Sequence, residues 1–259
     1  MRAVGLHEDV IVVTSRAYQT TCTLVRSGGE AFCIDSPVFP DELEILPAVA
    51  TQAGFDVVGL LATHADWDHL LGGYAFPEAP LATGELSVAR LANEPGVAQR
   101  ELREFDEDLY VERPKPLALP TPQQLPVPGH VGIGGQELEL QPADGHTPDG
   151  MAVYVPWARV LVCGDYLSPV EIPMFNPGAS AEAYLATLRR LEAMVEQSDH
   201  VVPGHGGAID AGRAAAILRE DVAYLEGLLT DPESAKLPLA RRNAQQRKHH
   251  AANVAALAG

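Results

Sequence analysis

The chain has 259 residues, 46% of them hydrophobic, which is enough to bury a sizeable core in one large domain or two small ones. Its formal net charge of −17 argues against nucleic acid or an anionic membrane as a partner, because both bind basic surfaces. The sequence shows no N-terminal signal pattern and no apolar run of membrane-spanning length, so we expect a soluble, cytoplasmic protein. Its three cysteines lack the even number and spacing of a disulfide framework and are expected to be buried thiols.

The N-terminal part of the chain predicts a strand–helix–strand order. Apolar runs predict the strands, and Gly28-Gly29 predicts a hairpin turn between two of them. Pro40 and the two acidic residues after it predict the start of a helix, because proline suits the first helical position and acids suit the positive end of the helix dipole. This helix is expected to end near Gly54. The predicted strands are 10–13, 21–25, 31–35 and 57–63.

The middle of the chain is expected to be helical and then irregular. A short strand is predicted at 81–83, a short helix at 87–93, and an amphipathic helix with a charged outer face at 97–110. The stretch 113–128 contains six prolines and cannot be helical, because proline lacks the amide hydrogen that a helix needs. It is interpreted either as a stiff connector between two halves or as the margin of a lid over a site.

The second half of the chain again alternates apolar runs with helical patterns. Ser180 is expected to cap the first of three helices through its hydroxyl group. The predicted strands are 137–140, 151–155, 160–163 and 200–202, and the predicted helices are 181–197, 208–229 and 238 to the C-terminus. Periodicity alone supports a mixed α/β protein.

The stretch 63–69, Thr-His-Ala-Asp-Trp-Asp-His, carries four metal-binding side chains directly after a predicted buried strand. They are His64, Asp66, Asp68 and His69. A strand that ends in a tight turn can direct alternate side chains to one point. Two imidazoles and two carboxylates packed this closely need compensation for repulsion and lost hydration, and a bound divalent cation supplies it. We therefore predict a metal site.

This motif resembles the Thr-His-x-His-x-Asp-His motif of metallo-β-lactamase-fold hydrolases. Three further motifs occur in the same order as in that family, so that the resemblance covers most of the chain. They are Gly145-His146-Thr147-Pro148-Asp149-Gly150, Gly164-Asp165 and Pro203-Gly204-His205-Gly206. The resemblance implies an α/β fold of four αβ/βα layers, in which two mixed β-sheets are flanked by helices. It implies a single domain over 1–259, with a helical and proline-rich insertion around 84–130 and C-terminal helices within 208–259.

The same resemblance implies two divalent metal ions and assigns their ligands. His64, Asp66 and His146 would hold the first ion; Asp68, His69 and His205 would hold the second; Asp165 would bridge them, together with a hydroxide. The hydroxide would be the nucleophile, and Asp68 would also act as a catalytic residue by steering its proton. Zinc is the expected metal, with iron or manganese as alternatives.

One position departs from the family pattern, because Asp66 stands where the family usually has its second histidine. With two divalent ions, three aspartates and one hydroxide, the cluster becomes formally neutral, which favours harder or more oxidised metals. Flavodiiron proteins, which share the fold, carry a carboxylate at this position. The short side chain of Asp66 leaves open whether it reaches the metal.

Three functions remain open from the sequence. The first is a metal-dependent hydrolase that cleaves an ester, thioester or lactone of a small molecule, as small cytoplasmic members of the resembling family often do. The second is a di-iron oxidoreductase that reduces oxygen or nitric oxide, or oxidises a persulfide. The third is a binding protein without catalysis. A homodimer through the C-terminal helices is also compatible with the sequence.

Other polar and aromatic residues are expected to be mainly structural. Asp35 is expected to support the metal site or a turn rather than to bind metal. Core packing is favoured over pocket roles for Trp67, Tyr166, Met174 and Phe175, of which Tyr166 is also a candidate oxyanion donor. The basic C-terminal residues Arg241, Arg242, Arg247 and Lys248 are expected to form a solvated helix face, and His7, His249 and His250 to be exposed.

Overall fold

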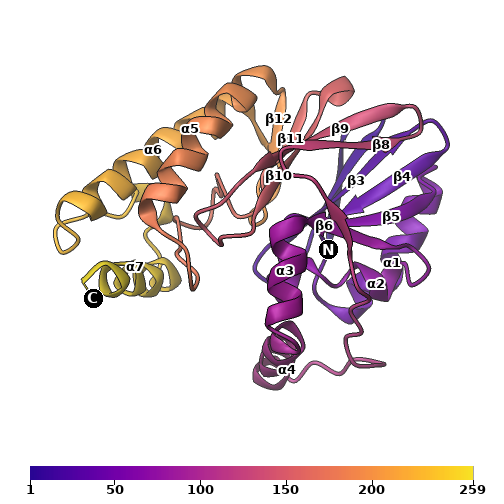
Figure 1. The fold of residues 1–259 in the computed structure, drawn as a ribbon, viewed down its shortest axis with the longest axis horizontal. Helices are drawn as coiled ribbons and strands as arrows, with labels where there is room; N and C mark the ends of the chain where they lie inside the picture. The colour runs from indigo at the N-terminus through magenta and orange to yellow at the C-terminus, as the bar shows by residue number, and fades with distance from the viewer. Residues whose placement is uncertain (259) are drawn as a thin grey trace.

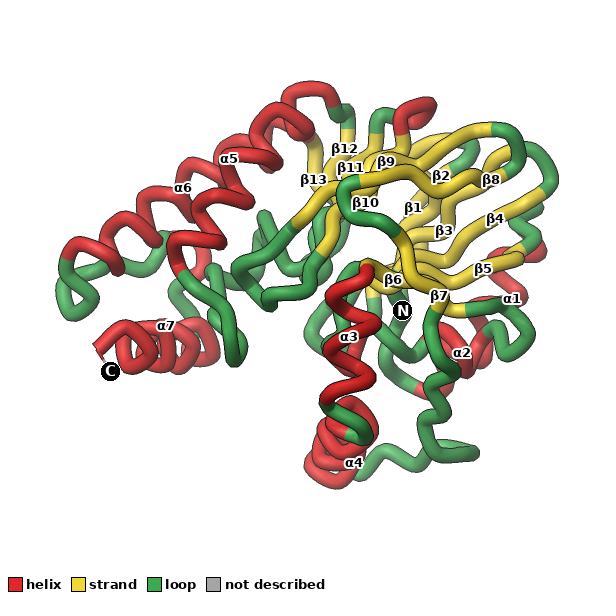
Figure 2. The backbone as a smooth tube through the Cα atoms, viewed as in Figure 1, coloured by secondary structure: helices red, strands yellow, loops and turns green. Residues whose placement is uncertain are grey.

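The computed structural model describes residues 1–258 and contains two β-sheets packed face to face, with helices on their outer sides (Figure 1). Both sheets mix parallel and antiparallel neighbours, which confirms the predicted α/β fold class. Figure 2 shows the strands together in the upper right of the view, with most helices to their left and below them. Among the described residues, no helix is long and apolar enough to cross a bilayer.

The first sheet has seven strands that follow one another in chain order. Its first four strands pair antiparallel, and the remaining three add in parallel. The turn at Gly28-Gly29 joins the third and fourth strands as predicted, with Gly28 in a left-handed conformation at φ 58° that glycine adopts without strain. The strands are β1 (Arg2–His7), β2 (Val10–Thr14), β3 (Thr21–Ser27), β4 (Glu30–Ile34), β5 (Val57–Ala62), β6 (Leu81–Gly84) and β7 (Gln123–Leu125).

The second sheet has six strands in the spatial order β13-β12-β11-β10-β9-β8. Only β11 and β12 pair in parallel, so their carboxyl ends lie at the same edge of the sheet. The strands are β8 (Gly129–Ile133), β9 (Gln136–Pro142), β10 (Met151–Val155), β11 (Val160–Val162), β12 (His200–Val202) and β13 (Ile209–Asp210).

Three apolar cores hold four layers together. The facing sides of the two sheets form the central core, with β-branched residues such as Val12, Val153 and Val160 fully or almost fully buried. A second core lies between the first sheet and α1 (Pro40–Gln52), α2 (Gly72–Ala75) and α4 (Val97–Leu109). A third core lies between the second sheet and α5 (Ala181–Gln197), α6 (Ala211–Thr230) and α7 (Ala244–Ala258). The remaining helix, α3 (Glu85–Asn93), directly follows β6.

Several boundaries differ from the sequence predictions for local reasons. β1 was not predicted, because as an edge strand with mostly exposed side chains it lacks an apolar pattern. β8 was also missed, since it contains two glycines and His130. The predicted helix at 208 begins at Ala211, because the Asp210 carboxylate accepts a hydrogen bond from Arg213 N at 2.8 Å and caps it there. The predicted helix at 238 begins at Ala244, after a short 3₁₀ turn at Leu239–Arg241.

The proline-rich stretch 113–128 runs from α4 to the second sheet. Leu117 and Leu119 pack against the core of the first sheet, and the Tyr74 hydroxyl donates to Lys115 O at 2.9 Å. Gln123–Leu125 adds to the first sheet as β7, and β8 of the second sheet begins only a few residues later. These contacts favour the connector interpretation of this stretch, since it carries the chain from one sheet to the other.

The predicted solvated face at the C-terminus is wrong for Arg241. This side chain is almost completely buried, with its Nη1 atom 2.6 Å from Asp221 Oδ1 and 2.8 Å from Glu171 O. Of the four basic residues in the predicted face, the other three, Arg242, Arg247 and Lys248, are exposed. The expectation of exposed histidines is also wrong: His7, His249 and His250 are partly buried, and burial lowers the pKa of His249.

The C-terminal segment holds the long loop at 166–180 in place. Besides Arg241, the Gln246 Oε1 atom accepts from Ile172 N at 2.8 Å, and Asn253 Nδ2 donates to Pro173 O at 2.7 Å. Buried polar side chains of this kind satisfy backbone groups that would otherwise lose their hydrogen bonds to water. The loop at 166–180 is therefore fixed by residues far from it in sequence.

We predict that Arg241→Met destabilises the protein by about 3 kcal/mol, because the buried carboxylate of Asp221 loses its cation. Burial already raises the pKa of Asp221 to about 7 while Arg241 opposes that shift. Urea unfolding followed by circular dichroism measures the difference. The exposed Lys248→Met variant is the control and should stay within about 0.5 kcal/mol of the unmodified protein. Equal stability of the two variants would contradict the structural role of Arg241.

Candidate metal centre

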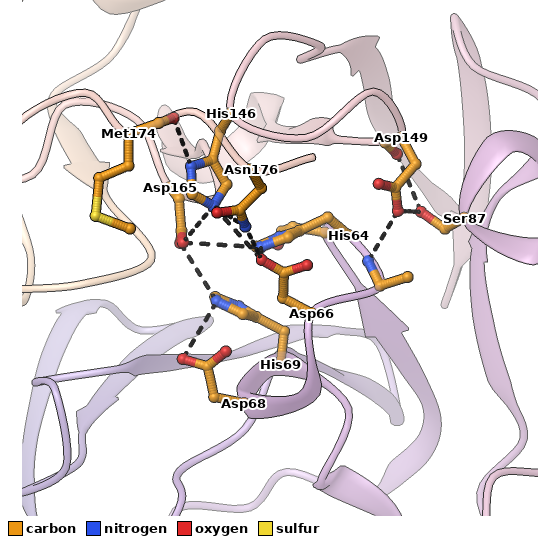
Figure 3. Close-up of polar contacts among 12 residues, drawn as sticks. His64, Asp66, Asp68, His69, Ser87, His146, Asp149, Asp165, Met174 and Asn176 are labelled. Carbon is orange, nitrogen blue, oxygen red and sulfur yellow. Dashed lines mark hydrogen bonds and ion pairs between the residues drawn. The ribbon is translucent and has the colours of Figure 1, made fainter. Parts of the chain in front are cut away.

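The predicted ligands come together at one edge of the two sheets, each from a loop that follows a strand. Figure 3 labels all of them except His205. β5 ends at Ala62 and leads into the 63–69 turn, whose residues 67–69 form a single 3₁₀ turn. The other three ligands follow strands of the second sheet. They are His146 after β9, Asp165 after β11 and His205 after β12.

The four histidines are oriented through their Nδ1 atoms. Three of the Nδ1 atoms make hydrogen bonds to oxygens, and that of His69 lies in ion-pair contact with a carboxylate, so the Nε2 atom of each ring points into the space between the sheets. The partners are Thr63 Oγ1 at 3.0 Å for His64, Asp35 Oδ2 at 3.0 Å for His69, Met174 O at 3.2 Å for His146 and Tyr18 O at 3.1 Å for His205.

The four Nε2 atoms converge on the carboxylate of Asp165. The distances to Asp165 Oδ2 are 3.2 Å from His146, 3.2 Å from His205 and 3.7 Å from His64, and the distance from His69 to Asp165 Oδ1 is 3.3 Å. The predicted bridging residue therefore lies at the centre of the cluster. Figure 3 shows this carboxylate between the rings of His64, His69 and His146.

Buried polar atoms without hydrogen-bond partners show that the cluster fits a metal ion. His64 Nε2, His69 Nε2 and Asp165 Oδ1 are buried and have no hydrogen-bond partner among the protein atoms. Buried polar atoms without partners are rare in native proteins, so these three atoms indicate that a ligand binds here. Nitrogen and oxygen donors arranged in this way suit zinc, iron or manganese.

The donor atoms fall into groups in which all atoms lie within 4.8 Å of one another. Two of the groups contain the same residues as the two ligand sets expected from the sequence, and the third contains Asp165 with one histidine from each set. They are His64, Asp66 and His146; Asp68, His69 and His205; and His64, His69 and Asp165.

Asp66 points one oxygen at the site and the other away from it. Its Oδ2 atom is 3.5 Å from His64 Nε2 and 3.6 Å from His146 Nε2. Its Oδ1 atom pairs with Arg90 Nη2 at 2.8 Å, and Asn176 Nδ2 donates to Oδ2 at 2.6 Å. One carboxylate oxygen of Asp66 therefore faces two of the candidate histidines, while the other is paired with Arg90.

Asp35 supports the site without entering it. Its carboxylate accepts hydrogen bonds from Thr63 N at 2.8 Å and Thr63 Oγ1 at 2.9 Å, and it lies against His69 Nδ1. Since the Thr63 hydroxyl donates to Asp35, it can accept from the Nδ1–H of His64. One buried carboxylate thereby orients two of the four imidazoles.

The electrostatics of the cluster demand positive charge at the ring nitrogens. Burial alone lowers the pKa of His146, but Asp165 and Asp66 together outweigh that effect and raise the pKa to about 10. Burial likewise opposes the rise at His205, where Asp165 and Glu171 raise the pKa to about 10. Either protons or metal ions can supply this charge, so metal binding should release protons.

Gly204 allows Asp165 to approach the backbone. A Cβ atom at this position would lie 2.0 Å from Asp165 Oδ1 and 3.1 Å from His69 Cε1. The glycine of the Pro203-Gly204-His205 motif is therefore required by close packing against two of the candidate ligands.

The structure adds residues that sequence reasoning missed. Arg90 and Asn176 contact Asp66. Glu171 is a carboxyl group near the candidate ligands. Burial raises its pKa, His205 lowers it, and Asp165 and Asp68 raise it further. Tyr18 lies at the second group, where its carbonyl accepts from His205 Nδ1. None of these residues belongs to a short motif, so no local signal in the sequence could have identified them.

The weaker pocket candidates all make packing or backbone contacts. The buried Tyr166 hydroxyl accepts from His146 N at 2.9 Å and donates to Ala143 O at 3.1 Å, so it is not free to stabilise an oxyanion. Phe175 packs against Tyr184, and Met174 contributes its carbonyl group to His146. Trp67 packs against Phe105 with ring centroids 4.8 Å apart and the ring planes tilted by 42°.

A family model supports the meaning of this cluster. The model of the metallo-beta-lactamase superfamily matches residues 15–205, a range that contains all the candidate ligands. The chain belongs to the metallo-beta-lactamase superfamily. Comparison with curated protein sequences finds no match.

Several solved structures share the fold with this chain. A metallo-beta-lactamase from Pontibacter korlensis is 22% identical, with a TM-score of 0.63 over 84% of this chain and 98% of that one. A metallo-beta-lactamase family protein from Thermus thermophilus is also 22% identical, with a TM-score of 0.65 over 87% of this chain and 83% of that one. The sec-alkylsulfatase Pisa1 from Pseudomonas sp. is 14% identical, with a TM-score of 0.75 over 98% of this chain and 49% of that one. At these identities the likeness shows the fold alone.

We predict that Gly204→Ala loses at least one of two bound ions, because the added methyl group displaces Asp165. Metal content of the folded, purified protein measures the effect. Gly73→Ala is the matched control, since a Cβ atom there meets nothing within 4 Å. Full metal content in Gly204→Ala would show that Asp165 does not need its present position.

Proposed function

We propose that the protein is a hydrolase that binds two divalent metal ions, zinc in the first place, and cleaves an ester, thioester or lactone of a small molecule. The observation that carries the proposal is the convergence of four imidazole Nε2 atoms on Asp165, at 3.2 to 3.7 Å. Members of the superfamily are mostly metal-dependent hydrolases, and the similar structures include lactamases and an alkylsulfatase.

In this proposal the ligands divide as the sequence suggested. His64, Asp66 and His146 would hold the first ion, Asp68, His69 and His205 would hold the second, and Asp165 would be shared between them. The chain is then a variant of the superfamily in which Asp66 replaces a histidine. When bound, the ions lower the pKa of a water molecule and polarise the bond to be cleaved.

Asp68 is the proposed catalytic residue among the ligands. Its Oδ2 atom accepts a weak hydrogen bond from Thr20 Oγ1 at 3.4 Å and lies 3.6 Å from His205 Nε2 and 3.8 Å from His69 Nε2. These contacts hold the carboxylate at the second group of ligands, with only 8% of the residue exposed. There it can accept the proton of the attacking water at Oδ2.

The surroundings of the second group favour a substrate with an apolar part. Tyr18 is 46% exposed, and its ring packs against Phe105 at 5.6 Å and Trp67 at 6.4 Å between centroids. Its left-handed backbone, at φ 51°, is unusual for a bulky residue and occurs where surrounding contacts enforce it. An exposed aromatic surface beside the ligands suits the acyl or alkyl group of a small organic molecule.

The net charge of −17 supports this substrate class over nucleic acid, which would need a basic surface. The proposed partner is accordingly a small molecule.

One observation favours a second candidate, a di-iron oxidoreductase. The carboxylate of Asp66 faces His64 and His146, and it gives the first group one more oxygen donor and one more negative charge than a histidine would. Harder donors of this kind suit iron and manganese better than zinc.

Metal analysis of protein purified without added metal separates the two candidates. We expect two zinc or manganese ions per chain, because the donor groups resolve into two sets around Asp165. Two iron ions with an optical or magnetic signal would favour the oxidoreductase. Less than one ion per chain, with no binding of added metal, would contradict both.

We also predict that hydrolysis of a chromogenic ester or thioester panel requires bound metal, and that Asp68→Ala lowers kcat/KM at least about 100-fold. The initial rate with and without a chelator measures the first effect, and steady-state kinetics measure the second. Asp56→Ala is the control, because that side chain is exposed. Metal-independent turnover, or full activity of Asp68→Ala, would rule out the proposed reaction.

A further inference from the structure

Arg90 reaches the metal centre from α3, a helix that supplies none of the candidate ligands. Its Nη2 atom lies 2.8 Å from Asp66 Oδ1, and its Nη1 atom donates to Asp149 Oδ1 at 3.0 Å. The side chain is only 22% exposed, so water screens these pairs incompletely. One guanidinium thus neutralises two carboxylates through separate nitrogen atoms.

The same helix connects the two loops that bear the first group of ligands. Ser87, one turn before Arg90, donates to Asp149 Oδ2 at 2.8 Å, and Ala65 N donates to the same oxygen at 2.9 Å (Figure 3). Residues three apart on a helix share a face, so Ser87 and Arg90 act on one side of α3. This side fixes the loop of Asp149 and His146 against the loop of Asp66.

The two oxygens of Asp66 have different tasks in this arrangement. Oδ1 is held by Arg90, while Oδ2 faces the Nε2 atoms of His64 and His146. The terminal torsion of an aspartate is broad, so a free carboxylate can rotate or offer both oxygens to a metal. The contact of Oδ1 with Arg90, together with the hydrogen bond from Asn176 Nδ2 to Oδ2 at 2.6 Å, removes that freedom and leaves Oδ2 alone facing the two histidines.

The charges make this contact specific to an aspartate at position 66. Without Arg90, the carboxylates of Asp66 and Asp149 would lose the cation they share and repel each other in a largely buried place. A neutral imidazole at position 66 would offer its nitrogen to a metal without such a counter-charge. The importance of Arg90 should therefore depend on which residue occupies position 66.

We propose that Arg90 is a positioning residue that fixes Asp66 as a one-oxygen ligand of the first ion, so that the Asp66–Arg90 pair takes the place of a single histidine. This inference rests on the metal centre proposed above. It concerns metal affinity and does not depend on which bond the protein cleaves.

Zinc affinity in four proteins tests the inference: the unmodified chain, Arg90→Met, Asp66→His, and the double variant. Competition with a chromophoric chelator gives the affinity for each ion. Arg90→Met should weaken one of the two sites about 10- to 100-fold, as loss of a group that orients a ligand does, and leave the other within about threefold. In the Asp66→His background, Arg90→Met should change neither site more than about threefold. Arg90→Lys should recover part of the loss, because an ammonium restores the charge but not the planar fork.

Arg103→Met, on the exposed face of α4, is the matched control and should leave both affinities unchanged. Circular dichroism establishes that each variant is folded. Should Asp66→His not fold, Asp66→Asn serves in its place, since an amide also needs no counter-charge.

Two results would overturn the inference. Unchanged zinc affinity in Arg90→Met would show that Arg90 does not affect the ion. An equal loss of affinity with Asp66 and with His at position 66 would show that Arg90 only holds α3 in place. Failure of the unmodified protein to bind zinc overturns the metal centre together with this inference. Binding of two zinc ions without hydrolysis of any ester overturns only the proposed reaction.

Discussion

A buried carboxylate surrounded by four imidazoles sets the main constraint on this structure. Asp165 is removed from water by the two sheets, and an isolated charge in such a place would be very unfavourable. The rings can balance it only if their Nε2 atoms face it, and that orientation is imposed by oxygens behind them. Asp35 holds His69 directly and His64 through Thr63, while the carbonyl groups of Met174 and Tyr18 hold His146 and His205. The cluster is thus preorganised by protein contacts alone.

The fold makes this convergence possible because it brings strand ends of two sheets to one edge. β5 of the first sheet and the parallel pair β11 and β12 of the second end beside each other, so short turns suffice to place the ligands. Asp165 can approach the backbone closely because Gly204 has no side chain. The carboxylate of Asp165 lies where a Cβ atom at that position would clash with it. Around this edge, α3 joins the two loops of the first group, and the aromatic ring of Tyr18 borders the second. The site is polar on one flank and apolar on the other.

The sequence predicted the parts that depend on local order. All seven candidate ligands lie in compact motifs at strand ends, where the direction of a side chain follows from a few neighbouring residues. Residues that approach from elsewhere could not be predicted, because their contacts depend on how helices and loops pack. Arg90 and Asn176 are of this kind, and so is Arg241, a basic residue in a basic segment that is buried only because Asp221 lies on the neighbouring helix. β1 and β8 each lie at the edge of a sheet, where a strand needs no strong apolar pattern, and they were therefore not predicted.

The anchoring of loop 166–180 by the C-terminal segment imposes an order on how the site can form. This loop carries Met174 and Asn176 to His146 and Asp66, yet its own backbone is held by Arg241, Gln246 and Asn253. A chain emerges from the ribosome beginning at its N-terminus, so the 63–69 turn is available long before the residues that fix the opposite wall. The first ligands can meet a metal ion while the chain is still growing. The wall beside them is completed only after residue 253 has been made and folded back.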